Sequence, residues 1–207
     1  IVEWVFADIG AMSAGAVSSG IYPTDSASQV LYLCEDSKTV FIFVEDEEQL
    51  DKVLSVRSRL PLLRKVVVID TTGLQRFNDP QVISFEELCR QGRDYAKANP
   101  RAIEHRLDEI DPASVAILVY TSGTTGKPKG AMHSHKGLVY QMRALQSLLA
   151  TTPEDERMCF LPLCHIAERS GGEFAAVLSG ARLNFVEDPN TIAENVREVS
   201  PTFMIAV

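Results

Sequence analysis

The chain has 207 residues, of which 45% are hydrophobic and 23% are charged, and its formal net charge is -8. This composition is ordinary for a soluble globular protein with one large domain or two small ones. The acidic balance argues against nucleic acid as the main partner, and no apolar run is long enough to cross a bilayer.

The cysteines form no CxxC pair, which indicates reduced, cytosolic usage and not a disulfide framework. They are Cys34, Cys89, Cys159 and Cys164. We expect Cys159 and Cys164 to be core residues and not nucleophiles. Peripheral membrane contact and oligomer formation stay open.

The first half of the chain alternates helix and strand patterns. The expected elements are a helix over 3–17, an extended piece over 20–22, a helix from Asp25 or Ser26 to about Glu35, a strand over 40–44, a helix over 47–60, a strand over 65–69 and a helix over 84–98. Ser84 and Glu87 are placed as a capping box. The charged stretch 99–112 is interpreted as an irregular linker.

The second half continues the alternation. The expected elements are a strand over 114–120, an extended piece over 130–133, a helix capped by Ser134 with the apolar stripe Leu138, Met142, Leu145 and Leu149, strands over 158–161 and 182–186 flanking a helix, a helix over 189–199 and a strand over 202–207. Strands alternating with helices predict an α/β fold with largely parallel sheets. We expect possible sub-lobes over 1–105 and 106–207.

A polar loop follows the strand over 114–120, in the stretch YTSGTTGKPKG from Tyr120 to Gly130. We call residues 121–129 the glycine-threonine loop. It is not a P-loop, because Gly123 and Gly126 are too close and Pro128 follows Lys127 where Ser or Thr is needed. We therefore expect an antiparallel hairpin that does not open into a helix, with a loop that is mobile without a ligand.

The loop lies in a basic part of an acidic chain. No acidic residue occurs between Asp111 and Glu154, whereas Lys127, Lys129, Lys136 and Arg143 all fall there, which leaves -12 for the rest. Glycine amides, hydroxyls and lysines are the groups that surround polyphosphates, so the pattern predicts an anion site. The alternatives are a solvated basic face and a flexible polar turn.

The motifs resemble one known family. YTSGTTGKPKG resembles the phosphate-binding signature of the acyl-adenylate-forming enzymes, which include acyl-CoA synthetases, luciferases and peptide-synthetase adenylation domains. Three further stretches are similar to the long-chain acyl-CoA synthetase branch: Gly20–Ser37, Glu47–Asp70 and LPLCHIAER from Leu161 to Arg169. The resemblance covers essentially the whole chain and implies part of the large N-terminal AMP-binding domain, without the C-terminal lid domain.

The resemblance implies a two-step ligase with ATP, Mg²⁺, a fatty acid and coenzyme A. A fatty carboxylate would attack the α-phosphate of ATP, and coenzyme A would then displace AMP. By position, the hydroxyl of Thr121 would contact Mg²⁺. The residues expected to surround the phosphates are Ser122, Gly123, Thr124, Thr125, Gly126, Lys127 and Lys129.

His165 is the second candidate, since the resemblance places it where the acyl carboxylate meets the α-phosphate. The alternative is a packed histidine at a strand-to-helix junction. Glu168 and Arg169 are interpreted as a structural pair with each other. His133 and His135 would point to one face of an extended piece, but no third ligand is evident and we do not expect a metal there.

Other parts of such an enzyme are not found in the sequence, among them an adenine-binding Tyr-Gly-x-Thr-Glu segment and the lid lysine. We expect the chain to be about a third of the enzyme and, alone, to bind ATP weakly and lack activity. Two alternatives stay open: an adenylating enzyme for an aryl or amino acid, and a non-catalytic nucleotide-binding module.

Overall fold

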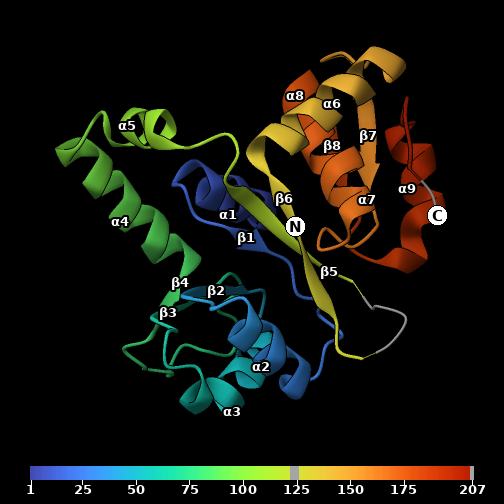
Figure 1. Ribbon diagram of the computed structural model, residues 1–207. Helices are drawn as coiled ribbons and strands as arrows, with labels where there is room; N and C mark the ends of the chain where they lie inside the picture. The colour runs from blue at the N-terminus through green and yellow to red at the C-terminus, as the bar shows by residue number, and fades with distance from the viewer. Residues whose placement is uncertain (122–125, 206–207) are drawn as a thin grey trace. The chain divides into compact units, whose positions relative to one another are not determined.

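A computed structural model describes residues 1–121 and 126–205 and divides into two compact units. The first twenty residues, Ile1–Gly20, join Ile110–Val207 in one unit, which we call the split unit. The middle unit is Ile21–Glu109. Figure 1 shows the elements of both. Within the described ranges, no helix combines the length and apolar character needed to cross a membrane.

The middle unit is a parallel sheet with helices on its faces. Its strands, in the order β2-β3-β4, are β2 (Phe41–Val44), β3 (Lys65–Val68) and β4 (Val82–Ser84), and both strand pairs are parallel. Its helices are α2 (Ala27–Asp36), α3 (Glu47–Val56), the 3₁₀ turn η1 (Arg57–Arg59), α4 (Phe85–Ala98) and α5 (Ala102–Glu109).

The alternation of side chains along β2 decides which helices cover which face. Ile42 and Val44 are buried in a cluster with apolar residues of α2 and α3. Phe43 points the other way and meets the ring of Phe85, at the start of α4, edge-on with centroids 6.5 Å apart. Successive residues of a strand face opposite sides, so α2 and α3 lie on one side of the sheet and the start of α4 on the other (Figure 1).

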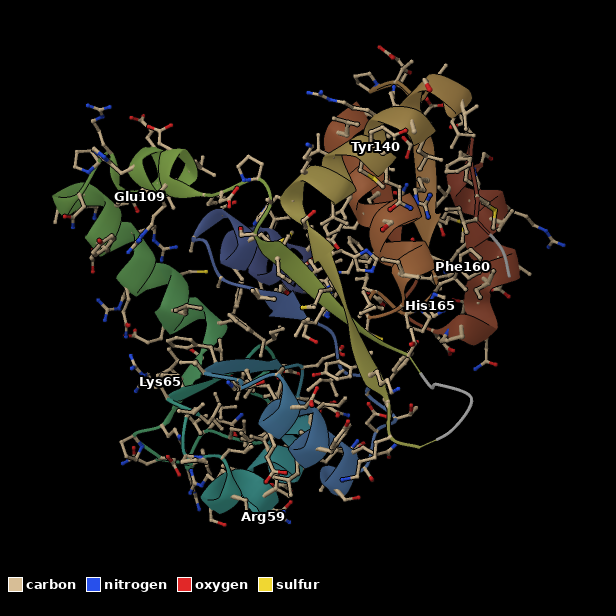
Figure 2. All side chains as sticks on the ribbon, in the orientation of Figure 1. Arg59, Lys65, Glu109, Tyr140, Phe160 and His165 are labelled. Carbon is tan, nitrogen blue, oxygen red and sulfur yellow. The ribbon has the colours of Figure 1, made fainter. Side chains whose placement is uncertain are left out.

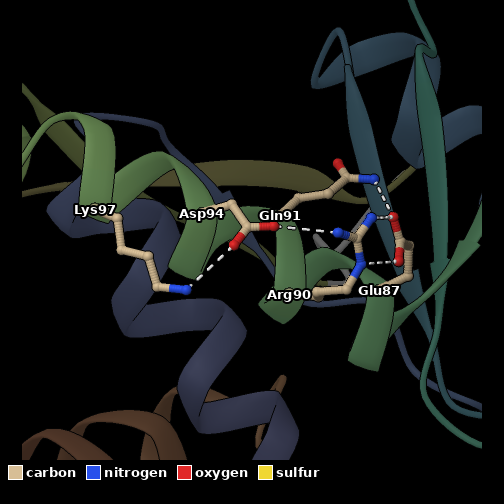
Figure 3. A network of polar contacts seen from close by, with 5 residues as sticks. All are labelled: Glu87, Arg90, Gln91, Asp94 and Lys97. Carbon is tan, nitrogen blue, oxygen red and sulfur yellow. Dashed lines mark hydrogen bonds and ion pairs between the residues drawn. The ribbon is translucent and has the colours of Figure 1, made fainter.

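Local capping sets where these helices begin. Ser26 forms a full capping box with Gln29 at the start of α2. Ser84 accepts a hydrogen bond from the backbone N–H of Glu87 at 3.0 Å, as predicted, but the carboxylate of Glu87 accepts bonds from Arg90 and Gln91. Figure 3 shows this network along α4. The hydrogen bond from Arg90, followed by the one from Gln91, lowers the pKa of Glu87 to about 2.

Two elements of the middle unit differ from the sequence prediction. Residues 102–109 form α5, not an irregular linker, and exposed ion pairs join Arg101 to Glu104 and Arg106 to Glu109. Oppositely charged residues three apart on a helix attract each other, so the charge pattern of this stretch favours a helix. The short strand β4 was not predicted because three residues carry little periodic signal.

The split unit contains two sheets. In the first, β1 (Ser18–Ser19) is parallel to β5 (Val115–Thr121), which is antiparallel to β6 (Lys129–Ser134). In the second, β7 (Glu156–Cys159) is parallel to β8 (Arg182–Phe185). The helices are α1 (Val2–Ser13), α6 (His135–Leu149), α7 (Ile166–Glu168), the π-helix η2 (Arg169–Phe174), α8 (Ala175–Ser179), the 3₁₀ turn η3 (Pro189–Thr191) and α9 (Ile192–Val199).

Strand β5 lies at the centre of the core of the split unit. Its buried residues Ala116, Ile117 and Val119 cluster with Leu138 and Met142 of α6. The predicted stripe of α6 is therefore buried at its start, whereas Leu149 at its end is exposed. The α/β prediction with largely parallel strands is confirmed. The predicted strand over 202–207 is reduced, within the described residues, to one bridge between Arg157 and Phe203.

Candidate functional site

The glycine-threonine loop connects the two strands of an antiparallel hairpin, β5 and β6. Tyr120 is paired with Gly130 and Thr121 with Lys129, so the ladder includes the two end residues of the loop. A Cβ atom on Gly130 would lie 3.2 Å from the ring of Tyr120, so glycine here leaves room for that ring. The predicted hairpin is confirmed, and the helix that follows a P-loop is absent from this position.

The hairpin places two of the candidate residues on the same face. Thr121 and Lys129 are direct cross-strand partners, and such partners project to one side of a sheet. Both residues are exposed. A hydroxyl and an ammonium group therefore lie beside each other at the end of the hairpin, where they can contact an anion together.

The rest of the loop is described in part. Gly126 has φ of +92°, in the left-handed region that glycine adopts without strain, and Gly126 and Lys127 are exposed. The expected phosphate contacts of Ser122, Gly123, Thr124 and Thr125 lie outside the described residues, as does the expected mobility of the loop.

His165 lies at the turn between β7 and α7, where it is exposed (Figure 2). It is the N-cap of α7, and its Nδ1 accepts a hydrogen bond from the backbone N–H of Ala167 at 3.2 Å. A neutral imidazole that accepts at Nδ1 carries its proton on Nε2. The ring is therefore not a packed core histidine, and its Nε2–H can donate to an anion.

Two buried ion pairs involve Glu168 and Arg169, which follow His165 in the chain. Glu168 Oε1 accepts from Arg157 Nη2 at 2.8 Å, and Arg169 binds both carboxylate oxygens of Asp8. The side chains of these four residues are between 0% and 3% exposed. Charged side chains are found in protein interiors when an opposite charge and hydrogen bonds compensate them.

The expectation that Glu168 and Arg169 pair with each other is wrong. Adjacent residues of a helix point in different directions, so their side chains do not face each other. Glu168 points to β7 and Arg169 to α1, where its guanidinium also lies over the rings of Trp4 and Phe174. Glu168 thus joins α7 to β7, whereas Arg169 joins η2 to α1.

Asp8, Arg157 and Glu173 were missed as members of this buried cluster. Asp8 carried a signal, because it is the single charged residue from Trp4 to Thr24 in an otherwise apolar and small-residue stretch. A lone charge on such a helix needs a buried partner. Glu173 carried a similar signal, because it is the single charged residue from Ser170 to Ala181, whereas Arg157 lies among other charged residues and carried none.

The cysteine and the other histidine candidates have different surroundings. Burial, followed by the charge of Glu168, raises the pKa of the Cys159 thiol to about 12, so it stays protonated at neutral pH, and Cys164 is also buried. His133 belongs to β6, but His135 is the first residue of α6, so the two do not share one extended piece. The described part of the chain holds no cluster of three metal-ligating side chains.

Comparisons with known proteins identify the family of this chain. The family model described as AMP-binding enzyme matches residues 1–207, the whole chain. The chain belongs to the AMP-binding enzyme family. It is 32% identical over 213 residues to the long-chain-fatty-acid–CoA ligase ACSBG1 of Rattus norvegicus, with 99% of this chain and 29% of that protein covered.

A second relative supports the family, and a solved structure supports the fold. The long-chain-fatty-acid–CoA ligase FadD15 of Mycobacterium bovis is 30% identical, with 99% of this chain and 32% of the relative covered. The crystal structure of the anthranilate CoA ligase AuaEII with anthranoyl-AMP superposes with a TM-score of 0.76 at 22% identity, over 99% of this chain and 38% of that one. The chain thus spans about a third of the length of its curated relatives.

One buried carboxyl in this AMP-binding chain has no hydrogen-bond partner among the described residues. It is Glu173, in η2, which is fully buried near Asp8 and Arg169. Burial, and next the negative charge of Asp8, raises the pKa of Glu173 to about 9, against the opposing charge of Arg169. Glu173 is therefore neutral at pH 7.

In wild type, Glu173 should make the free energy of unfolding fall as pH rises, and Glu173→Gln should abolish this fall. The pKa of Glu173 is raised from 4.5 to about 9, so between these values the unfolded chain releases the proton and the folded protein keeps it. The contribution of Glu173 is fully present below the lower value and is lost as pH rises, by at most about 1.4 kcal/mol per pH unit. Glutamine keeps the neutral form throughout, so the free energy of unfolding of the variant should gain on wild type from about pH 5 to about pH 8.

Urea unfolding across this range measures the difference. Glu198→Gln is the matched control, because Glu198 is exposed on α9 of the same unit. A difference between wild type and Glu173→Gln that stays constant with pH would show that Glu173 is ionised in the folded protein.

Proposed function

We propose that the protein is an ATP-dependent long-chain fatty acid–CoA ligase, to which this chain contributes the phosphate contacts. In the first step a fatty carboxylate oxygen attacks the α-phosphorus of ATP, and the bond to pyrophosphate breaks. In the second step the thiolate of coenzyme A attacks the acyl carbon of the acyl-adenylate, and AMP leaves. The observation that carries the proposal is the hairpin that presents Thr121 and Lys129 on one face, in a stretch without acidic residues.

The chemistry of the first step explains why such a hairpin suits it. A carboxylate must approach a polyanion, and negative charge accumulates on the departing pyrophosphate. Preorganised N–H, hydroxyl and ammonium donors stabilise that charge in the transition state. We propose that Lys127 and Lys129 supply positive charge, while Ser122, Gly123, Thr124, Thr125 and Gly126 surround the β- and γ-phosphates.

Thr121 fits a role at Mg²⁺, because Mg²⁺ takes oxygen ligands and keeps most of its water and phosphate ligands. Thr121 is exposed, and its position in the ladder directs its side chain to the same side as Lys129. One hydroxyl is not a complete site, so the ion would arrive with the nucleotide, where it supplies charge that offsets repulsion between the reactants.

His165 is proposed to act where the acyl carboxylate and the α-phosphate meet. Because Nδ1 accepts the Ala167 N–H, Nε2–H is the group that can donate to a carboxylate or phosphate oxygen. This would orient the nucleophile for attack, which is a positioning contribution and not a proton transfer.

Exchange of labelled pyrophosphate into ATP by the full-length protein tests the proposal. We expect exchange that depends on a long-chain fatty acid, with anthranilate and aspartate giving little. Exchange with the aryl or amino acid and not with the fatty acid would assign the protein to another branch of adenylating enzymes. Nucleotide binding without exchange for any acid would indicate a non-catalytic nucleotide-binding module.

A further inference from the structure

The buried carboxylate of Glu168 accepts hydrogen bonds from β7 and from the connection between β7 and α7. Glu168 Oε1 accepts from Arg157 Nη2 at 2.8 Å, and Glu168 Oε2 accepts from the backbone N–H of Leu161 at 3.2 Å. Arg157 belongs to β7, and Leu161 lies four residues before His165 along the chain. The side chain of Glu168 therefore links α7 both to the beginning of this connection, at Leu161, and to strand β7, at Arg157. His165 lies in the connection, between Leu161 and Glu168.

The guanidinium of Arg157 also binds the π-helix η2. Arg157 Nη1 donates to the carbonyl oxygen of Gly171 at 2.6 Å. A Cβ atom at Gly172 would lie 2.1 Å from Glu168 Oε1 and 2.9 Å from Arg157 Nη2, so this position must be glycine for the pair to fit. Strand β7, the turn and η2 are thus joined by the hydrogen bonds of one buried ion pair.

The direction of the His165 ring follows from this unit. His165 caps a short helix whose third residue is Glu168, and the N–H bound by Nδ1 belongs to Ala167, the second residue of α7. A shift of α7 relative to Leu161 would move both the backbone of His165 and the group that sets its tautomer. The position of Nε2–H therefore depends on Glu168 although Glu168 is fully buried.

We propose that the Arg157–Glu168 pair is a positioning device for His165, and that Glu168 is a positioning residue for adenylate formation. The inference rests on the role of His165 in the proposed function. Misplacement of reacting groups by about an ångström can cost about a hundredfold in rate, so loss of the pair should be felt in chemistry and not only in stability.

The second buried pair provides a matched control. Asp8 and Arg169 are buried to the same extent, but they join η2 to α1, and among the described residues neither side chain bonds to residues 160–165. Asp8→Asn should therefore lower stability while leaving the rate per folded molecule unchanged. This separates damage to the fold from displacement of His165.

The test is a double-mutant cycle in the full-length protein. Glu168→Gln keeps the size of the side chain, but both of its partners are donors and glutamine offers a single acceptor oxygen, so one bond is lost. The single-turnover rate of acyl-adenylate formation with a long-chain fatty acid should fall by about 10- to 100-fold in the wild-type background. In the His165→Ala background the same change should alter the rate by less than about twofold.

A second readout and a second variant keep the test decisive. The KM for ATP should stay near wild type, since the hairpin is untouched. If Glu168→Gln does not fold, as judged by circular dichroism, Arg157→Lys takes its place in the cycle, because an ammonium keeps the charge but lacks the fork that reaches both Glu168 and Gly171.

Equal losses in both backgrounds, after correction for folded protein, would show a structural role and overturn the inference. Asp8→Asn losses as large as those of Glu168→Gln would do the same. If His165→Ala alone leaves the rate unchanged, the proposed role of His165 fails, and positioning of that residue fails with it. If Glu168→Gln forms the adenylate at the wild-type rate while His165→Ala is slow, the positioning inference is overturned and the proposed role of His165 stands.

Discussion

Lys129→Ala in the full-length protein should lower kcat/KM for adenylate formation by about 30- to 1,000-fold, which corresponds to about 2–4 kcal/mol of transition-state stabilisation. Lys129 is exposed at the start of β6, directly opposite Thr121. In our proposal its ammonium faces the charge that develops on pyrophosphate. Because the side chain is exposed, its removal should change the free energy of unfolding by less than about 0.5 kcal/mol.

Pyrophosphate exchange and urea unfolding, measured on the same samples, check both halves of this result. Thr121→Ala should behave in the same way, and Thr121→Ser, which keeps the hydroxyl, should retain most of the activity. Lys136→Ala is the matched control, because Lys136 is also exposed in the acid-free stretch but lies in the first turn of α6. Loss of folding with normal activity per folded molecule would mean that the hairpin end is structural.

Arg169→Met should destabilise the protein by about 3–5 kcal/mol. Arg169 is fully buried, and it supplies the positive charge that compensates the carboxylate of Asp8. Without it, Asp8 keeps a hydrogen bond from the hydroxyl of Ser18, which does not offset a buried charge. The cost arises from the uncompensated carboxylate more than from the lost contact, so Asp8→Asn combined with Arg169→Met should be less destabilising than the sum of the single changes.

Chemical denaturation at pH 7 of the single and double variants measures this coupling. Arg90→Met is the matched control, because Arg90 forms ion pairs with Glu87 and Asp94 while its side chain is 58% exposed (Figure 3). Surface pairs of this kind contribute less than about 1 kcal/mol. Similar small effects at Arg90 and Arg169, or full additivity with Asp8→Asn, would contradict the assignment of a buried, mutually dependent pair.

The features of the candidate site that could be predicted are those determined by interactions between residues close in the sequence. The hairpin followed from the buried run before Tyr120 and from Pro128, which has no N–H to donate to a ligand or to a helix. The N-cap at Ser134 followed from a hydroxyl placed before an apolar helical stripe. The phosphate contacts and the Mg²⁺ role of Thr121 stay predictions, as does the partition of the chain into domains.

The errors have physical causes as well. The prediction of a linker over 99–112 rests on its density of charges, but opposite charges three residues apart stabilise a helix, here α5. Glu168 and Arg169 were paired because opposite charges stood side by side in the sequence. Adjacency along the chain is not adjacency in a helix, where side chains one residue apart diverge.

The sequence by itself determined the α/β class, the starts of the helices capped by Ser26, Ser84 and Ser134, and the antiparallel hairpin, because periodicity, capping and proline chemistry act within a few residues. Only the tertiary structure decided that α1 belongs with the second half of the chain and that Asp8 meets Arg169, a partner 161 residues away. It also decided that Glu168 binds both Arg157 and the backbone of Leu161. Buried charges take whichever opposite charge the chain path brings into the same low-dielectric interior, and no local pattern encodes that path.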